Sequence, residues 1–328
     1  MNNKPIIIIA GEPYSIFFEI YFKIFKSNFV NSYKRPLIII GSKLLMIKQM
    51  KKLNYNYKIK LLDPRKLSSI KITNKQINLI NVNFDFKKTF DKITNRSRNY
   101  IEKCFKIALK LMKDKVGYAL INGPINKKAF LSKKFLGVTE YLAFKTNSKN
   151  KTTMLIYNDL LSVCPITTHL PLKIVSKNIS KKKIIQHIKS IDIFFKTKLN
   201  KKPKIAITGL NPHCETNHKF SEEKKIIEPA INFLKKNKVN IKGPFPADTL
   251  FFKKNLRKYD VIIGMYHDQV LTPIKTLFGF NAINLTLGLP FIRISPDHGP
   301  NNQMLGKNKS DPNSLIQTLL FLNKIRVD

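Results

Sequence analysis

The chain has 328 residues, of which 43% are hydrophobic, and it carries 60 Lys and Arg against 20 Asp and Glu, a formal net charge of +40. Its length allows a large core divided between two domains, and its composition excludes disordered and collagen-like chains. Three widely spaced cysteines without a C-x-x-C pair exclude a disulfide framework and a zinc ribbon, and indicate a reducing compartment. No apolar run reaches 18 residues and the first, Ile6–Ala10, is too short for a signal peptide, so we expect a cytoplasmic protein.

The excess of positive charge has two explanations. A nucleic-acid or anionic-membrane partner would account for it. The alternative is compositional drift, because Lys, Asn, Ile, Phe and Tyr are all abundant and all have AT-rich codons. The lysines are scattered in small groups such as 181–183, without interleaved aromatic motifs or a basic heptad helix. We therefore expect neither a nucleic-acid nor a membrane partner, although such a surface attracts a small phosphorylated substrate.

Short β-branched runs alternate with helical patterns along the chain, which indicates an α/β protein with a mainly parallel sheet. The expected strands are Ile6–Ala10, Leu37–Ile40, Val116–Ile121, Leu161–Thr167, Lys204–Thr208 and Val261–Met265. The expected helices lie near Ile16–Phe29, Ile101–Lys113, Lys181–Phe195, Ser221–Lys235, Asp248–Lys258 and from Asp311-Pro312 to Lys324. Thr146–Thr152 and Lys196–Lys202 are polar and are expected to be surface loops.

Familiar nucleotide-binding motifs are missing from the sequence. It contains no G-x-G-x-x-G, no Walker A motif and no H-E-x-x-H, and only 12 glycines. An enzyme with this sequence that uses a dinucleotide must therefore bind it without the usual Rossmann fingerprint.

Three of the six histidines follow the carboxyl ends of expected strands. These are His169, His213 and His267. Open α/β sheets place their ligand crevices at such ends, and three imidazoles there fit a divalent-metal site with positions left open for substrate. Asp268 is a candidate hydrogen-bond partner of the metal ligand beside it. His187, by contrast, lies in a basic helix and is expected on the surface.

Candidate anion-binding side chains lie near other strand ends. Lys127 follows the tight turn Asn122-Gly123-Pro124, and Lys275 follows the strand that leads to His267. Arg293 is more informative than either lysine, because arginines are rare in this chain and a guanidinium grips phosphate or carboxylate through paired hydrogen bonds.

These residues belong to segments that closely resemble the 4-hydroxythreonine-4-phosphate dehydrogenase family of vitamin B6 biosynthesis. The resemblance covers nearly the whole chain, in order. The matching segments are Gly123–Lys127, Thr139–Leu142, Thr167–Leu172, Gly209–His213, Gly243–Thr249, Tyr266–Gln269, Gly288–Arg293 and Asp297–Gly299.

The resemblance implies an α/β, two-domain fold like that of the isocitrate and isopropylmalate dehydrogenases, with a cleft between the domains and an active site shared across a homodimer interface. It suggests a cofactor-side domain of residues 1–130 and 270–328, and a metal, substrate and dimerisation domain of residues 131–269.

The resemblance also assigns roles to residues. His169, His213 and His267 would bind a divalent metal (zinc, magnesium or cobalt). Asp248 and Asp268 are candidate proton acceptors because they lie close to these motifs in the sequence. Thr139, Lys275, Asn284 and Arg293 would contact the substrate, with Lys127 added for its position. Asp297, His298, Gly299 and Gly306 would hold NAD or NADP.

Several positions depart from the family pattern, and they leave alternatives open. Val138 stands where the family usually has a histidine, the glycine-rich stretch after the first strand is replaced by residues 14–18, and Asn308 stands where a second glycine is expected. A related dehydrogenase of a phosphorylated sugar acid, such as 4-phosphoerythronate or 4-phosphothreonate, is therefore an alternative. A zinc hydrolase and a basic nucleic-acid-binding protein are two further hypotheses.

Overall fold

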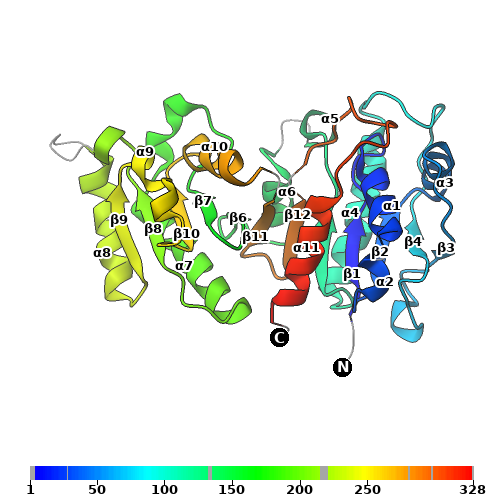
Figure 1. Ribbon diagram of the computed structural model, residues 1–328, viewed down its shortest axis with the longest axis horizontal. Coiled ribbons are helices and arrows are strands. Elements are labelled where there is room, and N and C mark those ends of the chain that lie inside the picture. The colour runs from blue at the N-terminus through cyan, green and yellow to red at the C-terminus, as the bar shows by residue number, and fades with distance from the viewer. Residues whose placement is uncertain are drawn as a thin grey trace. The chain divides into compact units, whose positions relative to one another are not determined.

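The computed structural model describes residues 4–27, 29–131, 135–214, 221–279, 281–296 and 298–326. The chain forms two compact units. The first unit comprises Met1–Tyr141 and Pro290–Leu322, and the second comprises Leu142–Leu289 and Asn323–Asp328. Each is a sheet flanked by helices (Figure 1), so the expected mixed α/β fold is confirmed.

The sheet of the first unit is parallel throughout. In order across the sheet its strands are β3 (Ile59–Leu61), β4 (Ile77–Asn81), β2 (Leu37–Gly41), β1 (Ile6–Ile9), β5 (Ala119–Asn122) and β12 (Ile292–Pro296). The four isoleucines of β1 are fully buried, as expected for a central strand covered on both faces. Its helices are α1 (Phe17–Lys26), α2 (Phe29–Ser32), α3 (Lys43–Lys52), α4 (Ser97–Lys113), α5 (Lys127–Leu131) and most of α11 (Asn313–Lys324), with a short 3-10 turn at Leu67–Ser69.

The sheet of the second unit contains one antiparallel strand. Its order is β11 (Ile283–Leu287), β6 (Thr153–Tyr157), β7 (Ser162–Pro165), β10 (Val261–Gly264), β8 (Ile205–Thr208) and β9 (Ile241–Phe245), and β6 runs antiparallel to both of its neighbours. The main helices are α7 (Lys181–Lys198), α8 (Glu228–Lys236) after a π turn at Glu223–Ile227, α9 (Ala247–Leu250) and α10 (His267–Phe278). Helix α6 (Val138–Lys145) spans the passage from the first unit to the second.

Local signals explain several helix ends. Ser180 accepts a hydrogen bond from the Lys183 amide and caps α7, and Ser221 accepts one from the Lys224 amide, as its sequence context predicts. The helix expected over Asp248–Lys258 is wrong. Helix α9 ends at Leu250 because Phe252 adopts an extended backbone, and only a 3-10 turn at Lys253–Asn255 follows.

His187 corrects another expectation, because it is buried rather than on the surface. It lies on the inner face of α7, 7% exposed, and its Nδ1 is 3.8 Å from Sγ of the buried Cys164. Burial lowers the pKa of this histidine from 6.5 to about 4, with help from the nearby charge of Lys183. The Lys-rich sequence around it hid the inward-facing stripe of Ile184, Ile188 and Ile191.

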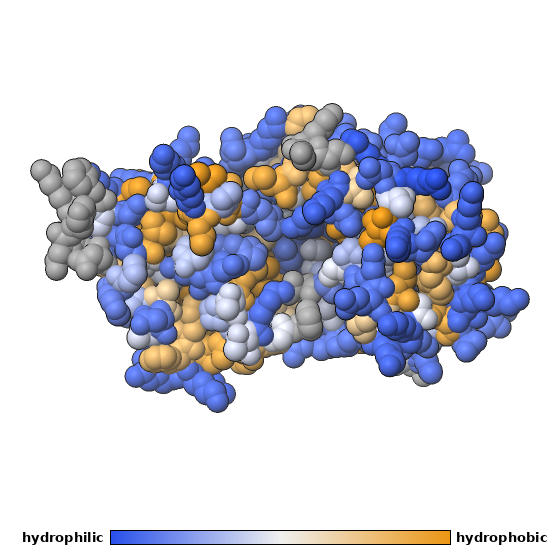
Figure 2. Space-filling model, turned by 90° about the horizontal axis from the view of Figure 1, so that it is seen from above, coloured by the Kyte–Doolittle hydropathy of each residue, from blue (hydrophilic) through white to orange (hydrophobic). Residues whose placement is uncertain are grey.

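The surface reflects the composition of the chain. Figure 2 shows hydrophilic side chains over much of the face in view, as 60 Lys and Arg residues require. Within the described residues, no helix combines the length and the apolar character needed to cross a membrane.

Candidate functional site

Four neighbouring parallel strands of the second unit end at one edge of its sheet. In the order β7, β10, β8 and β9, these strands are followed within a few residues by His169, His267, His213 and Asp248, respectively. Because parallel strands end on the same side, the fold brings together residues that lie up to about one hundred positions apart in the sequence. We call these four residues and their loops the histidine edge.

Buried hydrogen bonds fix the loops of the histidine edge to one another. After β7, the amide of Ile166 donates to Gly264 O at 2.8 Å, and the Thr167 hydroxyl donates to Met265 O at 2.7 Å. The loop that carries His169 is therefore tied to the loop that carries His267.

Gln269 joins the β10 loop to the end of β8. Its side-chain oxygen accepts hydrogen bonds from the Thr208 hydroxyl (2.9 Å) and the Met265 amide (2.7 Å), and its side-chain nitrogen donates to Gly209 O (2.8 Å). Sequence reasoning included Gln269 in a motif but gave it no role, because its partners are distant in the sequence. The structure makes it the residue that positions His267 relative to the His213 loop.

Glu223 holds the loop that carries His213. This fully buried carboxylate accepts hydrogen bonds from the amides of Leu210 (2.7 Å) and Asn211 (2.9 Å) and from the Asn211 side chain (2.9 Å). Gly209 lies against it, and a Cβ there would come within 2.9 Å of Glu223 Oε1 and 2.8 Å of Cys214 Sγ. His213 itself adopts a left-handed backbone, with φ of 58°, which turns the chain sharply at the sheet edge.

Two of the three histidines lie side by side. The ring centroids of His169 and His267 are 5.6 Å apart, and Nδ1 of His267 is 2.6 Å from Oδ1 of Asp268. This contact occupies one ring nitrogen and leaves Nε2 of His267 for a ligand, as is usual for metal-binding histidines. Among the residues that the structure describes, which omit 215–220 after the His213 loop, no three His, Cys, Asp or Glu side chains form a ready metal-binding group.

Asp248 lies at the start of α9, exposed, and its charge acts on Cys214. The pKa of the Cys214 thiol is raised mainly by burial, and the charges of Glu223 and Asp248 raise it further. The Asp248 carboxylate therefore lies near the His213 loop.

Two other candidate substrate-binding residues of the second unit lie on α10 and β11. Lys275 is exposed on α10, eight positions after His267, which is about 12 Å along a helix axis. Asn284 lies on β11, and its side-chain oxygen is buried without a hydrogen-bond partner among the described residues.

In the first unit, Arg293 is a buried charge. It lies on β12, 3% exposed, and its Nε donates to Oδ1 of Asn122 at the end of β5 at 2.8 Å. Burial lowers the pKa of its guanidinium to about 10, against the opposing effect of the Glu140 carboxylate. Thr139 precedes Glu140 on α6 and is half-buried, whereas Lys127 is exposed at the start of α5.

Glu12 is a second buried charge in the first unit that sequence reasoning did not select. It follows β1, beside the β5 end that carries Asn122, and it is 1% exposed. Burial raises its pKa to about 7, although the Ser97 side chain and the Asn126 backbone partly lower it. The end of the expected strand at Ala10 is visible in the sequence, but the burial of the carboxyl group two residues later is not.

The loop after β12 contains the expected cofactor residues. The His298 ring stacks on Phe17 at a centroid distance of 6.3 Å, and a Cβ on Gly299 would meet no atom within 4 Å. Gly306 has a φ of 76° and packs against the Phe90 ring. Asp297 lies outside the described residues. The open space at Gly299 suits the close approach of a ligand to the backbone.

A mixed α/β fold with histidine and carboxylate side chains beyond the ends of parallel strands defines this chain as an α/β protein with an enzyme-like site. The model of the family described as "Pyridoxal phosphate biosynthetic protein PdxA" matches residues 32–321. The chain belongs to this family.

Individual relatives agree with this membership. The chain is 36% identical to a 4-hydroxythreonine-4-phosphate dehydrogenase of Sulfurihydrogenibium sp., over 97% of this chain and 98% of the relative. It is 35% identical to a D-threonate 4-phosphate dehydrogenase of Pectobacterium atrosepticum, over 65% of this chain and 66% of the relative. A crystal structure of 4-hydroxythreonine-4-phosphate dehydrogenase from Klebsiella pneumoniae matches with a TM-score of 0.80 at 27% identity, covering 98% of both chains.

Proposed function

We propose that this protein oxidises 4-hydroxythreonine 4-phosphate with NAD or NADP, in the synthesis of pyridoxal phosphate. The product is a β-keto acid that loses carbon dioxide to give 3-amino-2-oxopropyl phosphate. The observation that carries the proposal is the histidine edge, where His169, His213 and His267 follow adjacent parallel strands in a chain of this family. We further propose a cytoplasmic homodimer whose active site is shared between subunits.

The three histidines suit a divalent cation. Imidazole nitrogens favour zinc or cobalt over magnesium, which prefers oxygen ligands. A bound cation would lower the pKa of the substrate hydroxyl and stabilise the negative charge that develops as carbon dioxide leaves. The contact between Nδ1 of His267 and Asp268 would leave Nε2 to hold the cation.

The proposal gives different roles to the two carboxylates near the histidines, Asp248 and Asp268. Asp268 is engaged by the His267 ring, so we assign the hydroxyl proton to Asp248, which is exposed near the His213 loop. A bound nicotinamide would supply the acceptor for the hydride from the carbon that bears this hydroxyl. Loss of carbon dioxide then leaves an electron pair that a proton from solvent or Asp248 neutralises.

We also assign contacts with the substrate and the cofactor to individual residues. We assign the phosphoryl group to the cations Lys127, Lys275 and Arg293, and the polar groups of the substrate to Thr139 and Asn284. The buried guanidinium of Arg293 is held in one orientation by Asn122, which prepares it for paired hydrogen bonds. His298, Gly299 and Gly306, together with Asp297, are assigned to the dinucleotide.

A second candidate is the oxidation of a phosphorylated sugar acid such as D-threonate 4-phosphate or 4-phosphoerythronate. It is favoured by Val138, which replaces the usual histidine of the substrate loop, and by the similarity to the Pectobacterium enzyme. Val138 is half-buried at the start of α6, next to Thr139. An apolar side chain there removes a hydrogen-bonding group from the substrate's surroundings.

A turnover panel tests both candidates. The protein is supplied with 4-hydroxythreonine 4-phosphate, D-threonate 4-phosphate or 4-phosphoerythronate, with NAD or NADP and with zinc, cobalt or magnesium, and reduced dinucleotide is followed by its absorbance. We expect the highest kcat/KM with 4-hydroxythreonine 4-phosphate. A higher value for a sugar acid supports the second candidate, and phosphate release without reduced dinucleotide supports a hydrolase instead.

A further inference from the structure

The loop of residues 298–310 has little regular structure of its own. Its internal backbone hydrogen bonds are local turns, from the amides of Met304, Leu305 and Lys307 to the carbonyl oxygens of Asn301, Asn302 and Met304, respectively. Three of its residues, Asn301, Gly306 and Asn308, adopt left-handed backbones. Such a segment keeps one shape only if the surrounding structure holds it.

One end of the loop is held by residues at the start of α1. The Ile16 amide donates to Pro300 O at 3.2 Å, and the Phe17 ring stacks on His298. Phe17 belongs to the segment that departs from the glycine-rich family pattern, so this contact is a feature of this chain's own residues.

The other end is held by an ionic group further along α1. Lys23 Nζ donates to Asn308 O (3.0 Å), Ser310 O (2.6 Å) and Glu19 Oε1 (3.1 Å), which uses all three of its N–H groups. Glu19 is 2% exposed, and its Oε1 also accepts the Ser310 amide at 2.6 Å. The pair thus binds both the amide and the carbonyl of Ser310.

Tyr55 adds a third contact. Its hydroxyl donates to Oδ1 of Asn308 at 3.0 Å. Asn308 has a φ of 55°, a backbone that asparagine tolerates better than most residues. The asparagine that stands where the family has glycine therefore keeps the left-handed turn and gains a side-chain contact.

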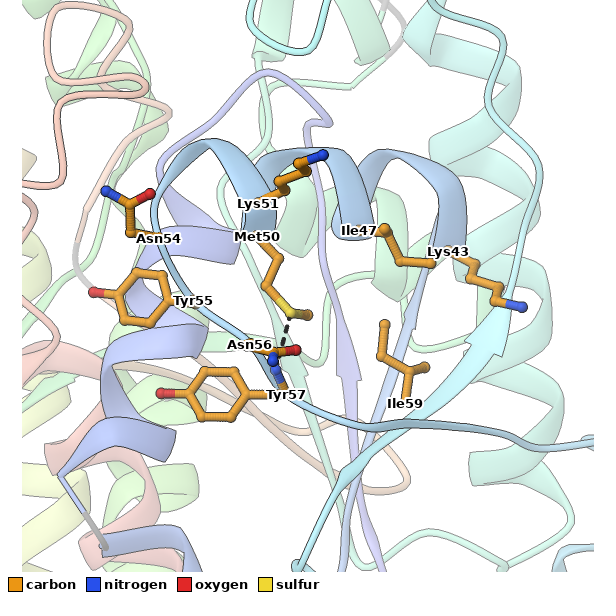
Figure 3. A pocket seen from close by; sticks show the side chains of 9 residues that line it. All are labelled: Lys43, Ile47, Met50, Lys51, Asn54, Tyr55, Asn56, Tyr57 and Ile59. Carbon is orange, nitrogen blue, oxygen red and sulfur yellow. Dashed lines mark hydrogen bonds between the residues drawn. The ribbon is translucent and has the colours of Figure 1, made fainter.

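Tyr55 also lines a cavity of about 620 Å³ between α3 and β3, with Tyr57 beside it (Figure 3). The two rings stack at a centroid distance of 5.9 Å. The Tyr57 hydroxyl, however, donates to Phe22 O of α1 rather than to the loop. This difference provides a matched control.

We propose that Glu19, Lys23 and Tyr55 form a clamp that positions the loop of residues 298–310 for dinucleotide binding. The inference rests on the proposed function for the cofactor role of this loop. The three side chains are positioning residues, because they contact the loop from behind through Asn308 and Ser310. The clamp fixes the end of the loop that follows Gly306, while Phe17 fixes the beginning.

Hydrogen exchange tests the clamp without any turnover. The backbone amides of Gly299 and of residues 301–310 are compared in the full-length protein and in the variants Lys23→Met, Tyr55→Phe and Tyr57→Phe. We expect these amides to exchange about tenfold faster in Lys23→Met and less than that in Tyr55→Phe, because a charge-assisted group is worth more than one neutral hydrogen bond. Unchanged exchange in Lys23→Met, or equal acceleration in Tyr57→Phe, overturns the clamp.

Steady-state kinetics test the positioning role. Lys23→Met is expected to raise the KM for dinucleotide about tenfold, with kcat and the KM for phosphorylated substrate within about twofold of wild type. Tyr55→Phe and Asn308→Gly are expected to give similar, smaller increases that do not add in the double variant, because they remove the same contact. Faster exchange with an unchanged dinucleotide KM overturns the positioning role. Wild-type protein without dinucleotide-dependent turnover refutes the proposed function instead, and the exchange result then still decides the clamp.

Discussion

The sheet edges of the two units carry their polar residues in opposite ways. At the histidine edge of the second unit, the imidazoles reach solvent, while the groups that hold their loops, such as Glu223, are buried. In the first unit, Glu12, which follows β1, and Arg293, which bonds to Asn122 at the end of β5, are themselves buried. Substitutions at the histidine edge should therefore change activity with little effect on stability, whereas substitutions of the buried charges in the first unit show how much each charge costs or adds to stability.

The variant His267→Ala tests the histidine edge and should have the largest effect on activity. Under the proposed function, turnover should fall at least about a thousandfold, since loss of the cation removes several kcal/mol of transition-state stabilisation. The free energy of unfolding should change by less than about 0.5 kcal/mol, because the side chain is 33% exposed. Turnover, metal content and urea unfolding are measured together, with Lys258→Ala as the exposed control. A variant that keeps its metal and its activity refutes the ligand assignment.

The variant Glu12→Gln tests whether the buried carboxyl group of Glu12 lowers the stability of the protein at neutral pH. The folded-state pKa of Glu12 is about 7, against 4.5 for an ordinary glutamate. As pH rises from 4.5 to 7, the unfolded chain ionises this group and the folded chain does not, so stability is progressively lost, by up to about 3 kcal/mol above pH 7. The glutamine variant should lack this loss and be more stable than wild type at pH 8.

The measurement is urea unfolding from pH 4 to pH 8 for wild type, Glu12→Gln and the control Glu102→Gln. Glu102 is exposed on α4, so its substitution should leave the pH dependence unchanged. Parallel pH profiles for wild type and Glu12→Gln would show that burial does not govern this carboxyl group.

The variant Arg293→Met tests whether this buried charge contributes to substrate binding or to the stability of the fold. Under the proposed function, kcat/KM should fall about a hundredfold, because charge-assisted hydrogen bonds to phosphate are lost. The free energy of unfolding should change by no more than about 1 kcal/mol, because removing a desolvated guanidinium offsets the lost bond to Asn122. Arg293→Lys, which keeps the charge but not the paired geometry, is the matched variant. Large destabilisation with normal kinetics would make Arg293 a structural residue.

The sequence predicted best what depends on local patterns. Apolar β-branched runs such as Ile6–Ile9 identified central strands, and Ser221 marked a helix start. The sequence missed six strands, β3, β4, β6, β9, β11 and β12, because their short runs mix polar and apolar residues. The helix expected after Asp248 was wrong because nothing local reports the extended backbone at Phe252.

The residues of the candidate site also differ in whether the sequence alone could identify them. Strand-end histidines are visible in a sequence, since the strand and the histidine are adjacent. Gln269 and Glu223 are not, because their partners come from other strands and loops and are fixed only by the folded chain. The burial of His187 and Glu12 likewise depends on packing, which composition and charge alone do not report.

The variant Asp268→Asn should have the smallest effect. It compares the proposed metal ligand His267 with the carboxylate that contacts its ring. Asp268 is 78% exposed, so the substitution should leave stability unchanged. Loss of its charge next to Nδ1 of His267 should weaken metal affinity about tenfold, the low end of the range for such partners, because solvent screens the contact. Competition with a chelator measures this affinity. An unchanged value would reduce Asp268 to a surface residue, whereas a loss as large as that of His267→Ala would place its carboxylate among the metal ligands.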